Sequence, residues 1–379
     1  MNILSQLIGT LYVVIMLYFG MGFIKGLRRS ISKKSLTQNF QDFTIIIPFR
    51  NEGETLRALV RSLDVLKQPK DSNVKFIFSN DHSEDHSLTV LQDTLAQFPF
   101  EYEIILSAGD GKKAALQTAI HHVNTDWIVT TDADVEVPQT WLLEIEKAIA
   151  QTHGQMIVMP IELSTDGSFF QDLQKLESAA LVAMNAGALM MGNMFSANGA
   201  NLAFTKTVFN KVGGYAPEMN VASGDDEFLL KRVHHFDKSL IDVYFTSESK
   251  VVAQPCHTFK ELINQRTRWV SKTKINKLDI KQFPVIIPTF FMLYFIVSIP
   301  VFLFTGYSLH STGLLFHKWI GDLIIYGFMA SFFSLSLRKN PQVVLLILAM
   351  PFYQIAYMAP VVYKRFFGQF AWKGRKYHA

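Results

Sequence analysis

The apolar positions of this 379-residue chain fall into long uncharged runs at both ends, on either side of a region of mixed polarity. Residues 1–24, 283–309 and 340–363 contain no Asp, Glu, Lys or Arg, and a fourth run, Trp319 to Leu337, is interrupted only by Asp322. Because about 20 apolar residues cross the hydrocarbon core of a bilayer, each run is long enough to predict a membrane-spanning segment. The region between them predicts a globular domain.

Within the mixed region, short β-rich runs alternate with helical patterns. Strands are predicted at Phe43–Ile47, Val74–Phe78, Tyr102–Leu106, Trp127–Thr131 and Met156–Ile161, and helices at Thr55–Lys67, Leu88–Gln97, Lys112–Val123 and Gln139–Ala150. Such alternation predicts an α/β fold with a mostly parallel sheet covered by helices on both faces. Ligands bind beyond the carboxyl ends of such strands, where Pro48–Glu52, Asn80–Asp81 and Asp132–Asp134 are expected.

The positions of the basic residues predict which side of the membrane the globular domain faces. A cleaved signal peptide usually has a basic residue before its apolar run. Here the basic residues follow residues 1–24 instead, at Lys25, Arg28, Arg29, Lys33 and Lys34. We therefore expect an anchor whose N-terminus faces out and a domain on the cytoplasmic side.

The number of membrane spans stays open. Four spans would put the C-terminus outside, but Lys364, Arg365, Lys373, Arg375 and Lys376 favour an inside tail, so one C-terminal segment is expected to be re-entrant or interfacial. The sequence predicts an anchor at 1–25, a catalytic domain at 38–258, an amphipathic interface helix at 259–282, a membrane region at 283–365 and a basic tail at 366–379.

Composition narrows the partners and the compartment. The net charge of +4 is small, and its basic residues cluster beside apolar segments, which favours a membrane surface over nucleic acid. Cys256 is the one cysteine, so no disulfide forms within the chain, which fits a reducing compartment. We expect a multi-pass protein of the cell (inner) membrane with a cytoplasmic catalytic domain.

The segment TTDADVEVP (130–138) places Asp132 and Asp134 just past an apolar strand. Mg²⁺ and Mn²⁺ favour oxygen ligands and commonly join one or two carboxylates to substrate phosphates. Asp is also common in turns, so an acidic turn is the alternative for this motif taken alone. The motif predicts a divalent cation, Mg²⁺ or Mn²⁺, that neutralises a leaving diphosphate.

Two further segments predict nucleotide contacts. In SNDHSED (79–85), Asp81 ends the second strand, where a carboxylate accepts a hydrogen bond from a nucleobase. In GKKAALQ (111–117), Lys112 opens a helix whose N-terminus attracts phosphate, and a solvated basic turn is the alternative.

The segment SGDDEFLLKR (223–232) begins another helix with Asp225 and Asp226. Adjacent like charges raise the pKa of one carboxyl group, which suits a general base that takes a proton from a hydroxyl group. Stabilisation of a helix N-terminus by acidic residues is the alternative.

The segment QRTRW (265–269) precedes an apolar run. Gln265, Arg268 and Trp269 fall at positions i, i+3 and i+4 and share one helix face. Arg pairs with phosphate and indole stacks on a sugar ring, although an interfacial helix has the same composition for membrane reasons alone. The stretch Met184–Met194 is expected in the core or against the membrane rather than around a cofactor.

These motifs in this order, from about Phe43 to Trp269, resemble the family-2 inverting glycosyltransferases of the GT-A fold. The sequence QRTRW is similar to the QxxRW motif of their membrane-embedded members. Those members include chitin-oligosaccharide, poly-N-acetylglucosamine, cellulose and hyaluronan synthases, and a related motif occurs in ceramide glucosyltransferases.

The resemblance implies a role for each motif. It implies nucleoside contacts at Pro48–Glu52 and Asp81, diphosphate and metal contacts at Asp132 and Asp134, and Asp226 as the base beside Asp225. It implies a nucleotide-sugar donor, such as UDP-GlcNAc or UDP-glucose, and a polysaccharide or lipid-linked acceptor. Asn80 departs from the family, which usually has a second Asp there.

Two questions stay open at this point. The short membrane region favours a single-addition glycolipid glycosyltransferase, whereas QxxRW favours a processive synthase. Outside these enzymes, the alternatives are a catalytically silent nucleotide-binding membrane scaffold and a nucleotidyltransferase.

Overall fold

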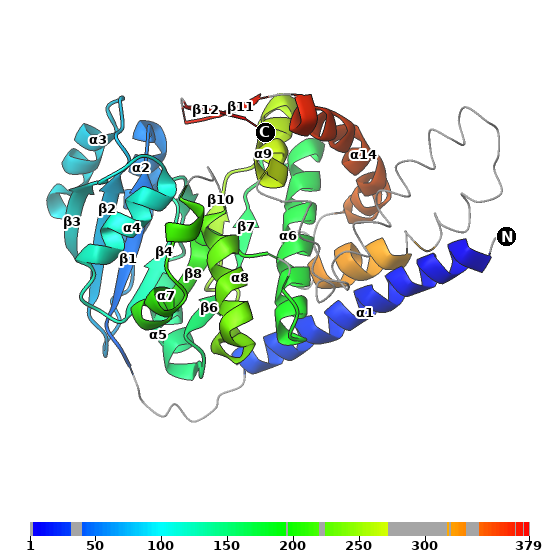
Figure 1. Cartoon of the computed structure of the whole chain (residues 1–379), viewed down its shortest axis with the longest axis horizontal. Coiled ribbons are helices and arrows are strands. Elements are labelled where there is room, and N and C mark those ends of the chain that lie inside the picture. Colours follow the sequence, from blue (N-terminus) through cyan, green and yellow to red (C-terminus); the bar gives the residue numbers. More distant parts are fainter. Residues whose placement is uncertain are drawn as a thin grey trace.

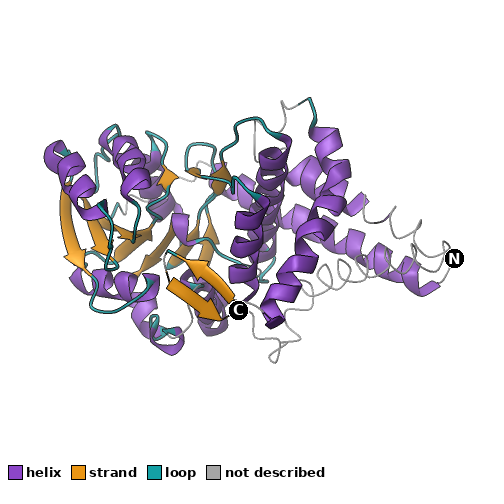
Figure 2. Ribbon diagram, turned by 90° about the horizontal axis from the view of Figure 1, so that it is seen from above, coloured by secondary structure: helices purple, strands orange, loops and turns teal. Residues whose placement is uncertain are grey.

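The computed structural model describes residues 3–31, 40–194, 196–219, 224–271, 317, 320–330, 341–367, 369–373 and 375–378. An α/β unit occupies one end of the molecule, and long helices are gathered at the other (Figures 1 and 2). The predicted run 283–309 and residues 272–282 of the predicted interface helix lie outside the described residues.

The α/β unit contains a seven-stranded sheet in the order β3-β2-β1-β4-β8-β6-β9. Its strands are β1 (Phe43–Phe49), β2 (Val74–Asn80), β3 (Glu101–Leu106), β4 (Trp127–Thr130), β6 (Met156–Val158), β8 (Leu202–Thr205) and β9 (Ile241–Val243). The pairs β1–β2, β2–β3, β1–β4 and β6–β9 are parallel, whereas β8 runs antiparallel to β4 and β6. The α/β prediction is confirmed, and the sheet is mixed rather than uniformly parallel.

The fifth predicted strand, Met156–Ile161, is wrong as a single strand, because the strand breaks at Met159 and Pro160. The chain forms β6 and then β7 (Ile161–Leu163), which belongs to a second sheet of order β5-β10-β7, with β5 at Val135–Glu136 and β10 at Val251–Ala253. Proline has no N–H group for a ladder hydrogen bond, which favours a break between strands.

Both faces of the large sheet are covered, and its central strands β1 and β4 are buried along their whole length. All seven residues of β1 are buried. Side chains alternate along a strand, so Ile45 and Ile47 enter one core and Ile46 the other. In α2 (Gly53–Asp64), Leu56, Leu59, Val60 and Leu63 follow helical spacing and pack on the face of Ile45.

The other helices divide between the same two faces. The face of Ile45 also contacts α3 (Ser87–Thr94) and α5 (Trp141–Gln151), whereas the face of Ile46 contacts α4 (Lys112–His122) and α8 (Asp225–Asp237). Short elements complete the unit: α7 (Lys206–Lys211) and the 3-10 turns η1 (Leu95–Gln97), η2 (Gly199–Asn201), η3 (Ala216–Glu218) and η4 (Lys238–Leu240).

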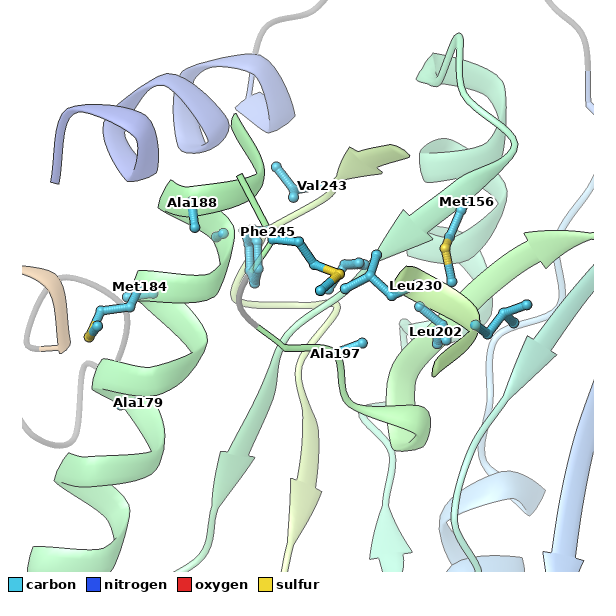
Figure 3. Packing of buried hydrophobic residues seen from close by; sticks show 14 of the residues in the cluster. Met156, Ala179, Met184, Ala188, Ala197, Leu202, Leu230, Val243 and Phe245 are labelled. Atoms are coloured by element: carbon cyan, nitrogen blue, oxygen red, sulfur yellow. The ribbon is translucent and has the colours of Figure 1, made fainter. Parts of the chain in front are cut away.

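The helical end of the molecule is centred on α6 (Phe169–Met190), which is buried along most of its length. Around it lie α1 (Ile3–Ile31), α9 (Phe259–Ser271), η6 (Leu323–Ala330) and α14 (Val343–Phe367). Met184 and Ala188 of α6 join the core that also contains Val243 and Phe245 (Figure 3). Met184 is therefore in the core, which is one of the two placements expected for the Met-rich stretch.

Helix α1 packs closely on α6 at a pair of glycines. A β-carbon added at Gly187 would overlap the backbone oxygen of Phe19, and one added at Gly22 would overlap the backbone oxygen of Gly187. Small residues at helix crossings allow backbones to approach in this way. The first apolar run is thus packed tightly against α6.

Two described helices are long and apolar enough to cross a membrane, at Gly9–Ile31 and Val343–Arg365. Fewer than half of the residues in either apolar window are buried. Helix α14 is continuous although it contains Pro351 and Pro360. Asp322 is buried and accepts a hydrogen bond from the Tyr12 hydroxyl at 3.3 Å, so this carboxyl group lies between α1 and the segment 320–330.

The chain ends in a hairpin of β11 (Gln369–Trp372) and β12 (Arg375–His378), which no sequence signal predicted. The hairpin extends from the helical end toward α2 and α3 (Figure 1). Lys373 lies in its turn with a φ of 47°.

Candidate active site

The carboxyl ends of β1, β2 and β4 meet at one edge of the sheet, as the sequence predicted. Pro48 pairs with Ser79 of β2, beyond the point where the β1–β4 ladder ends at Ile46. A proline is therefore tolerated there, because no β4 neighbour needs its N–H. The strand then delivers Arg50 and Glu52 to the edge where Asp81 and Asp132 also lie.

Lys112 brings carboxylates from two elements together at this edge. Its ammonium nitrogen lies 2.6 Å from an Asp132 oxygen after β4 and 3.4 Å from an Asp225 oxygen at the start of α8. Asp81 accepts a hydrogen bond from the Gly111 amide at 2.8 Å, which orients the start of α4. Gly111 has a φ of +95°, a conformation that favours glycine.

We call Lys112, Asp132, Asp225 and Asp226 the acidic centre. Burial alone would lower the pKa of Lys112, but the charges of Asp132 and Asp225 raise it above its ordinary value. Burial raises the pKa of Asp132, and the nearby charge of Asp134 adds to this against the opposing effect of Lys112. Burial alone would raise the pKa of Asp225, but the charge of Lys112, a backbone hydrogen bond and the charge of Lys113 together lower it.

Asp226 is held at the centre by a backbone amide. One of its oxygens accepts from the Gly199 N–H at 3.0 Å, and the other from the Glu227 N–H at 2.7 Å. A β-carbon on Gly199 would lie 3.1 Å from an Asp225 oxygen and 3.5 Å from the Lys112 nitrogen. The turn η2 therefore forms one wall of the acidic centre, which the sequence did not reveal.

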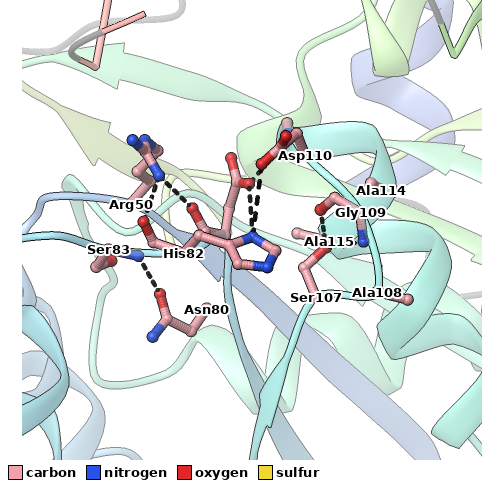
Figure 4. Close-up of polar contacts among 12 residues, drawn as sticks. Arg50, Asn80, His82, Ser83, Ser107, Ala108, Gly109, Asp110, Ala114 and Ala115 are labelled. Carbon is pink, nitrogen blue, oxygen red and sulfur yellow. Dashed lines mark hydrogen bonds and ion pairs between the residues drawn. The ribbon is translucent and has the colours of Figure 1, made fainter.

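The end of β2 forms a second polar corner (Figure 4). Arg50 donates to the backbone oxygens of Asp81, at 2.9 Å, and His82. The Asn80 side-chain oxygen accepts a hydrogen bond from the Ser83 amide at 2.8 Å and fixes the turn. The family that the sequence resembles usually has Asp at this position. Asn80 thus holds the backbone beside Asp81 without adding a charge.

Glu52 receives an unexpected partner from the far end of the chain. It is 8% exposed and forms an ion pair with Lys373 of the hairpin. The Lys373 backbone oxygen also accepts from Arg50 at 3.2 Å. In the sequence, Lys373 belongs only to a basic tail, because no local pattern links it to Glu52, more than three hundred positions away.

The QRTRW residues lie on α9, as predicted, but its most buried charged member is one that the prediction did not single out. Arg266 is 7% exposed, whereas Trp269 is 37% exposed. Gln265 accepts from Arg266 at 3.1 Å, and Arg268 is half-buried. Helix α9 packs against α14 through a hydrogen bond of 2.6 Å from Lys364 to Asn264.

The donor set of the acidic centre fits a hard divalent cation. Asp134 is exposed, and with Asp132, Asp225 and Asp226 it gives more carboxylates than Lys112 neutralises. Asp81, His82 and Asp110 form a separate group whose ligand atoms lie within 4.8 Å of one another. The assignment of the metal to Asp134 stays a prediction.

Comparison with known proteins identifies the class of domain. Residues 44–213, a little under half of the chain, match the family model described as "Glycosyl transferase family 2". This stretch, which contains β1, β2, β4 and Asp132, is therefore a glycosyltransferase domain.

Particular relatives match over shorter parts. The undecaprenyl-phosphate 4-deoxy-4-formamido-L-arabinose transferase of Sodalis glossinidius (strain morsitans) is 26% identical over 149 residues, 39% of this chain and 45% of that protein. CsbB of Bacillus subtilis (strain 168) is 30% identical over 114 residues, 30% of this chain and 35% of CsbB. The chain spans less than half of the length of both.

One solved structure shares the fold over almost the whole chain. The mannosyltransferase PcManGT from Pyrobaculum calidifontis, solved with GDP-Man and Mn²⁺, has a TM-score of 0.53 and 13% identity. The alignment covers 96% of this chain and 99% of that one. At this identity the similarity establishes the fold alone.

Proposed function

We propose that this chain is an inverting glycosyltransferase that moves a sugar from a nucleotide-sugar donor to a hydroxyl group of a lipid or glycan acceptor at a membrane. The donor class is a UDP-sugar such as UDP-GlcNAc or UDP-glucose. The observation that carries the proposal is the convergence of Lys112, Asp132, Asp225 and Asp226 in a fold that carries a family 2 domain.

The proposed mechanism is a single displacement. Asp226 removes the proton from the acceptor hydroxyl, whose oxygen attacks the anomeric carbon as the bond to the nucleotide diphosphate breaks. The Gly199 and Glu227 amides, which donate to its two oxygens, orient the Asp226 carboxylate for this step. Inversion follows because the attacking and leaving oxygens lie on opposite faces of the sugar.

The remaining residues bind and orient in this proposal. Glu52, Asp81 and the Pro48 turn contact the nucleoside, and Lys112 lies beside the diphosphate. Asp132 and Asp134 would hold Mg²⁺ or Mn²⁺, which would supply positive charge to neutralise the leaving diphosphate. Of the QRTRW residues, Arg268 contacts the diphosphate, and Gln265 and Trp269 contact the acceptor.

The membrane arrangement is part of the proposal. Residues 1–25 act as an anchor, α9 lies at the bilayer surface, and the segment 283–365 inserts, with the catalytic domain on the cytoplasmic side of the cell membrane. Support comes from the two long apolar helices and from the basic residues Arg28 and Arg29, which end α1.

A second candidate is transfer to a lipid phosphate instead of a hydroxyl. It is favoured by the similarity to a transferase whose name specifies undecaprenyl phosphate. The two candidates differ in their need for a base, since a phosphate oxygen is already ionised at neutral pH. Asp226 is required only if the acceptor is a hydroxyl group.

The test measures nucleotide release by the purified full chain in detergent with Mn²⁺ and a panel of UDP- and GDP-sugars. Wild type and Asp226→Asn are each given undecaprenyl phosphate, a chitin oligosaccharide or no acceptor, and UDP binding is measured by calorimetry. Transfer to a hydroxyl group is supported if wild type releases nucleotide, Asp226→Asn does not, and the variant still binds UDP. Full release by the variant with undecaprenyl phosphate supports the second candidate, and no release by wild type under any condition opposes both.

A further inference from the structure

A buried ion pair joins α6 to the QRTRW helix. The Arg266 guanidinium of α9 pairs with Glu177 of α6, and these residues are 7% and 4% exposed. Charged groups are costly to bury unless their hydrogen-bonding atoms are satisfied. The second Glu177 oxygen accepts from the Tyr357 hydroxyl of α14 at 2.6 Å, so one carboxylate connects three helices.

Arg266 also contacts the two ends of QRTRW. Its guanidinium carbon lies 4.2 Å from the centre of the Trp269 ring, within the range of a cation–π contact. Its Nη1 donates to the Gln265 side-chain oxygen at 3.1 Å. The same buried cation therefore fixes Gln265 and the indole of Trp269.

The three helices lie side by side at one end of the molecule (Figure 1). Helix α14 is one of the two helices apolar enough to span a membrane, and Tyr357 lies in it. Tyr357 contacts Arg266 as well as Glu177, with its ring centre 5.7 Å from the guanidinium carbon. A shift of α14 would therefore move Tyr357 away from Arg266 and break its hydrogen bond to Glu177.

We infer that Arg266 is a positioning residue for the acceptor site, held by Glu177 and Tyr357, and that it sets the orientation of Trp269 and Gln265. This inference rests on the proposed function, in which Trp269 and Gln265 contact the acceptor. Acceptor handling then depends on how α14 sits against α6, while nucleotide binding at Asp81 and Glu52 does not.

A purely structural clamp between the helices is the competing interpretation, and it predicts a different pattern. Loss of a clamp lowers the unfolding temperature and affects every function alike. Loss of positioning changes the environment of Trp269 and slows transfer while UDP binding stays unchanged. The two are separated by variants that keep the size of the side chain.

The experiment uses the full chain in detergent with Glu177→Gln and Tyr357→Phe. Because the chain has five tryptophans, the near-ultraviolet circular dichroism of Trp269 is obtained as wild type minus Trp269→Phe. Lys364→Met is the matched control, because it removes another bond between α14 and α9 without touching Arg266. Turnover is read as UDP release from UDP-GlcNAc or the UDP-sugar that wild type uses, and UDP affinity by calorimetry.

We expect Glu177→Gln and Tyr357→Phe to lose at least half of the Trp269 signal and to slow turnover about tenfold. The UDP dissociation constant should stay within about twofold, and Lys364→Met should resemble wild type. In a Trp269→Phe background, Glu177→Gln should have less than a twofold further effect, because interacting positions are not additive.

Two results would overturn the inference. In the first, neither substitution changes the circular dichroism signal of Trp269. In the second, Glu177→Gln slows turnover as much in the Trp269→Phe background as it does in wild type. If wild type releases no nucleotide, the proposed function fails instead, and the Trp269 spectrum alone still decides whether Arg266 positions the ring.

Discussion

Lys112 allows a quantitative test of the acidic centre. It lies 2.6 Å from Asp132 and 3.4 Å from Asp225, and its side chain is 20% exposed. The substitution Lys112→Met removes the ammonium group and keeps most of the apolar side chain. Asp132 and Asp225 then lose their shared cation while burial still disfavours their charged forms.

The magnitude follows from how exposed the partners are. Removing one member of a fully buried pair costs about 3–5 kcal/mol, and an exposed pair contributes at most about 1 kcal/mol. Asp132 is 33% exposed and Asp225 is 9% exposed, so the case falls between these limits. We expect a loss of about 2 kcal/mol, which lowers the unfolding midpoint of a domain of this size by roughly 4–8 °C.

The assay is thermal unfolding of the full chain in detergent, with and without Mn²⁺. A cation bound by the unpaired carboxylates replaces the lost positive charge, and binding to the folded state alone raises the midpoint. The midpoint of Lys112→Met should therefore rise more with Mn²⁺ than that of wild type.

Lys75→Met provides the matched control. Lys75 also lies between two carboxylates, 3.2 Å from Glu101 and 3.3 Å from Glu103, but these are 71% and 34% exposed and lie along β3. It should lose less than about 1 kcal/mol and gain nothing specific from Mn²⁺. Equal losses in both variants, or no larger response of Lys112→Met to Mn²⁺, would refute the reasoning.

Three further predictions follow from other contacts. Gly187→Ala should lower the unfolding midpoint through an overpacking cost of about 1–3 kcal/mol, because its β-carbon meets the Phe19 backbone, whereas Gly20→Ala, with open space around it, should not. Lys373→Gln should weaken UDP binding about tenfold by calorimetry, since a charged hydrogen bond at Glu52 is lost; unchanged affinity would separate the hairpin from the nucleotide site. For Glu103, burial is outweighed by His122 and Lys75, which lower its pKa, so its stabilisation is present above about pH 4.5 and is lost in acid. Glu103→Gln should therefore lower the midpoint at pH 7 and reduce its fall between about pH 5 and 3, and an unchanged pH profile would contradict this.

The sheet and its ligand edge were predictable because local patterns determine them. The mainly apolar β1 is typical of a strand covered on both faces, and the acidic residues closely follow the strands β2 and β4. The start of α8 at Asp225 was likewise visible in the sequence. Periodicity and strand ends carry this information within about ten residues.

The contacts that the sequence did not reveal all join distant segments. Glu177 and Arg266 are 89 positions apart, and each alone looks like an ordinary charged residue of an amphipathic helix. Gly199 holds Asp226 through a backbone amide, which every residue except proline possesses. Such partners are set by helix packing and loop paths, and no spacing rule within one segment encodes them.

The bond between Lys373 and Glu52 spans 321 positions of the chain. At about 5–20 residues per second of synthesis, Glu52 leaves the ribosome roughly 15–65 s before its partner does. By the end of that interval the sheet strands and the acidic residues have been synthesised, but the lysine that pairs with Glu52 has not. The contact at Glu52 therefore forms only after the residues of α14 have been synthesised. This corner of the site is completed later than the parts formed by residues 44–213 alone.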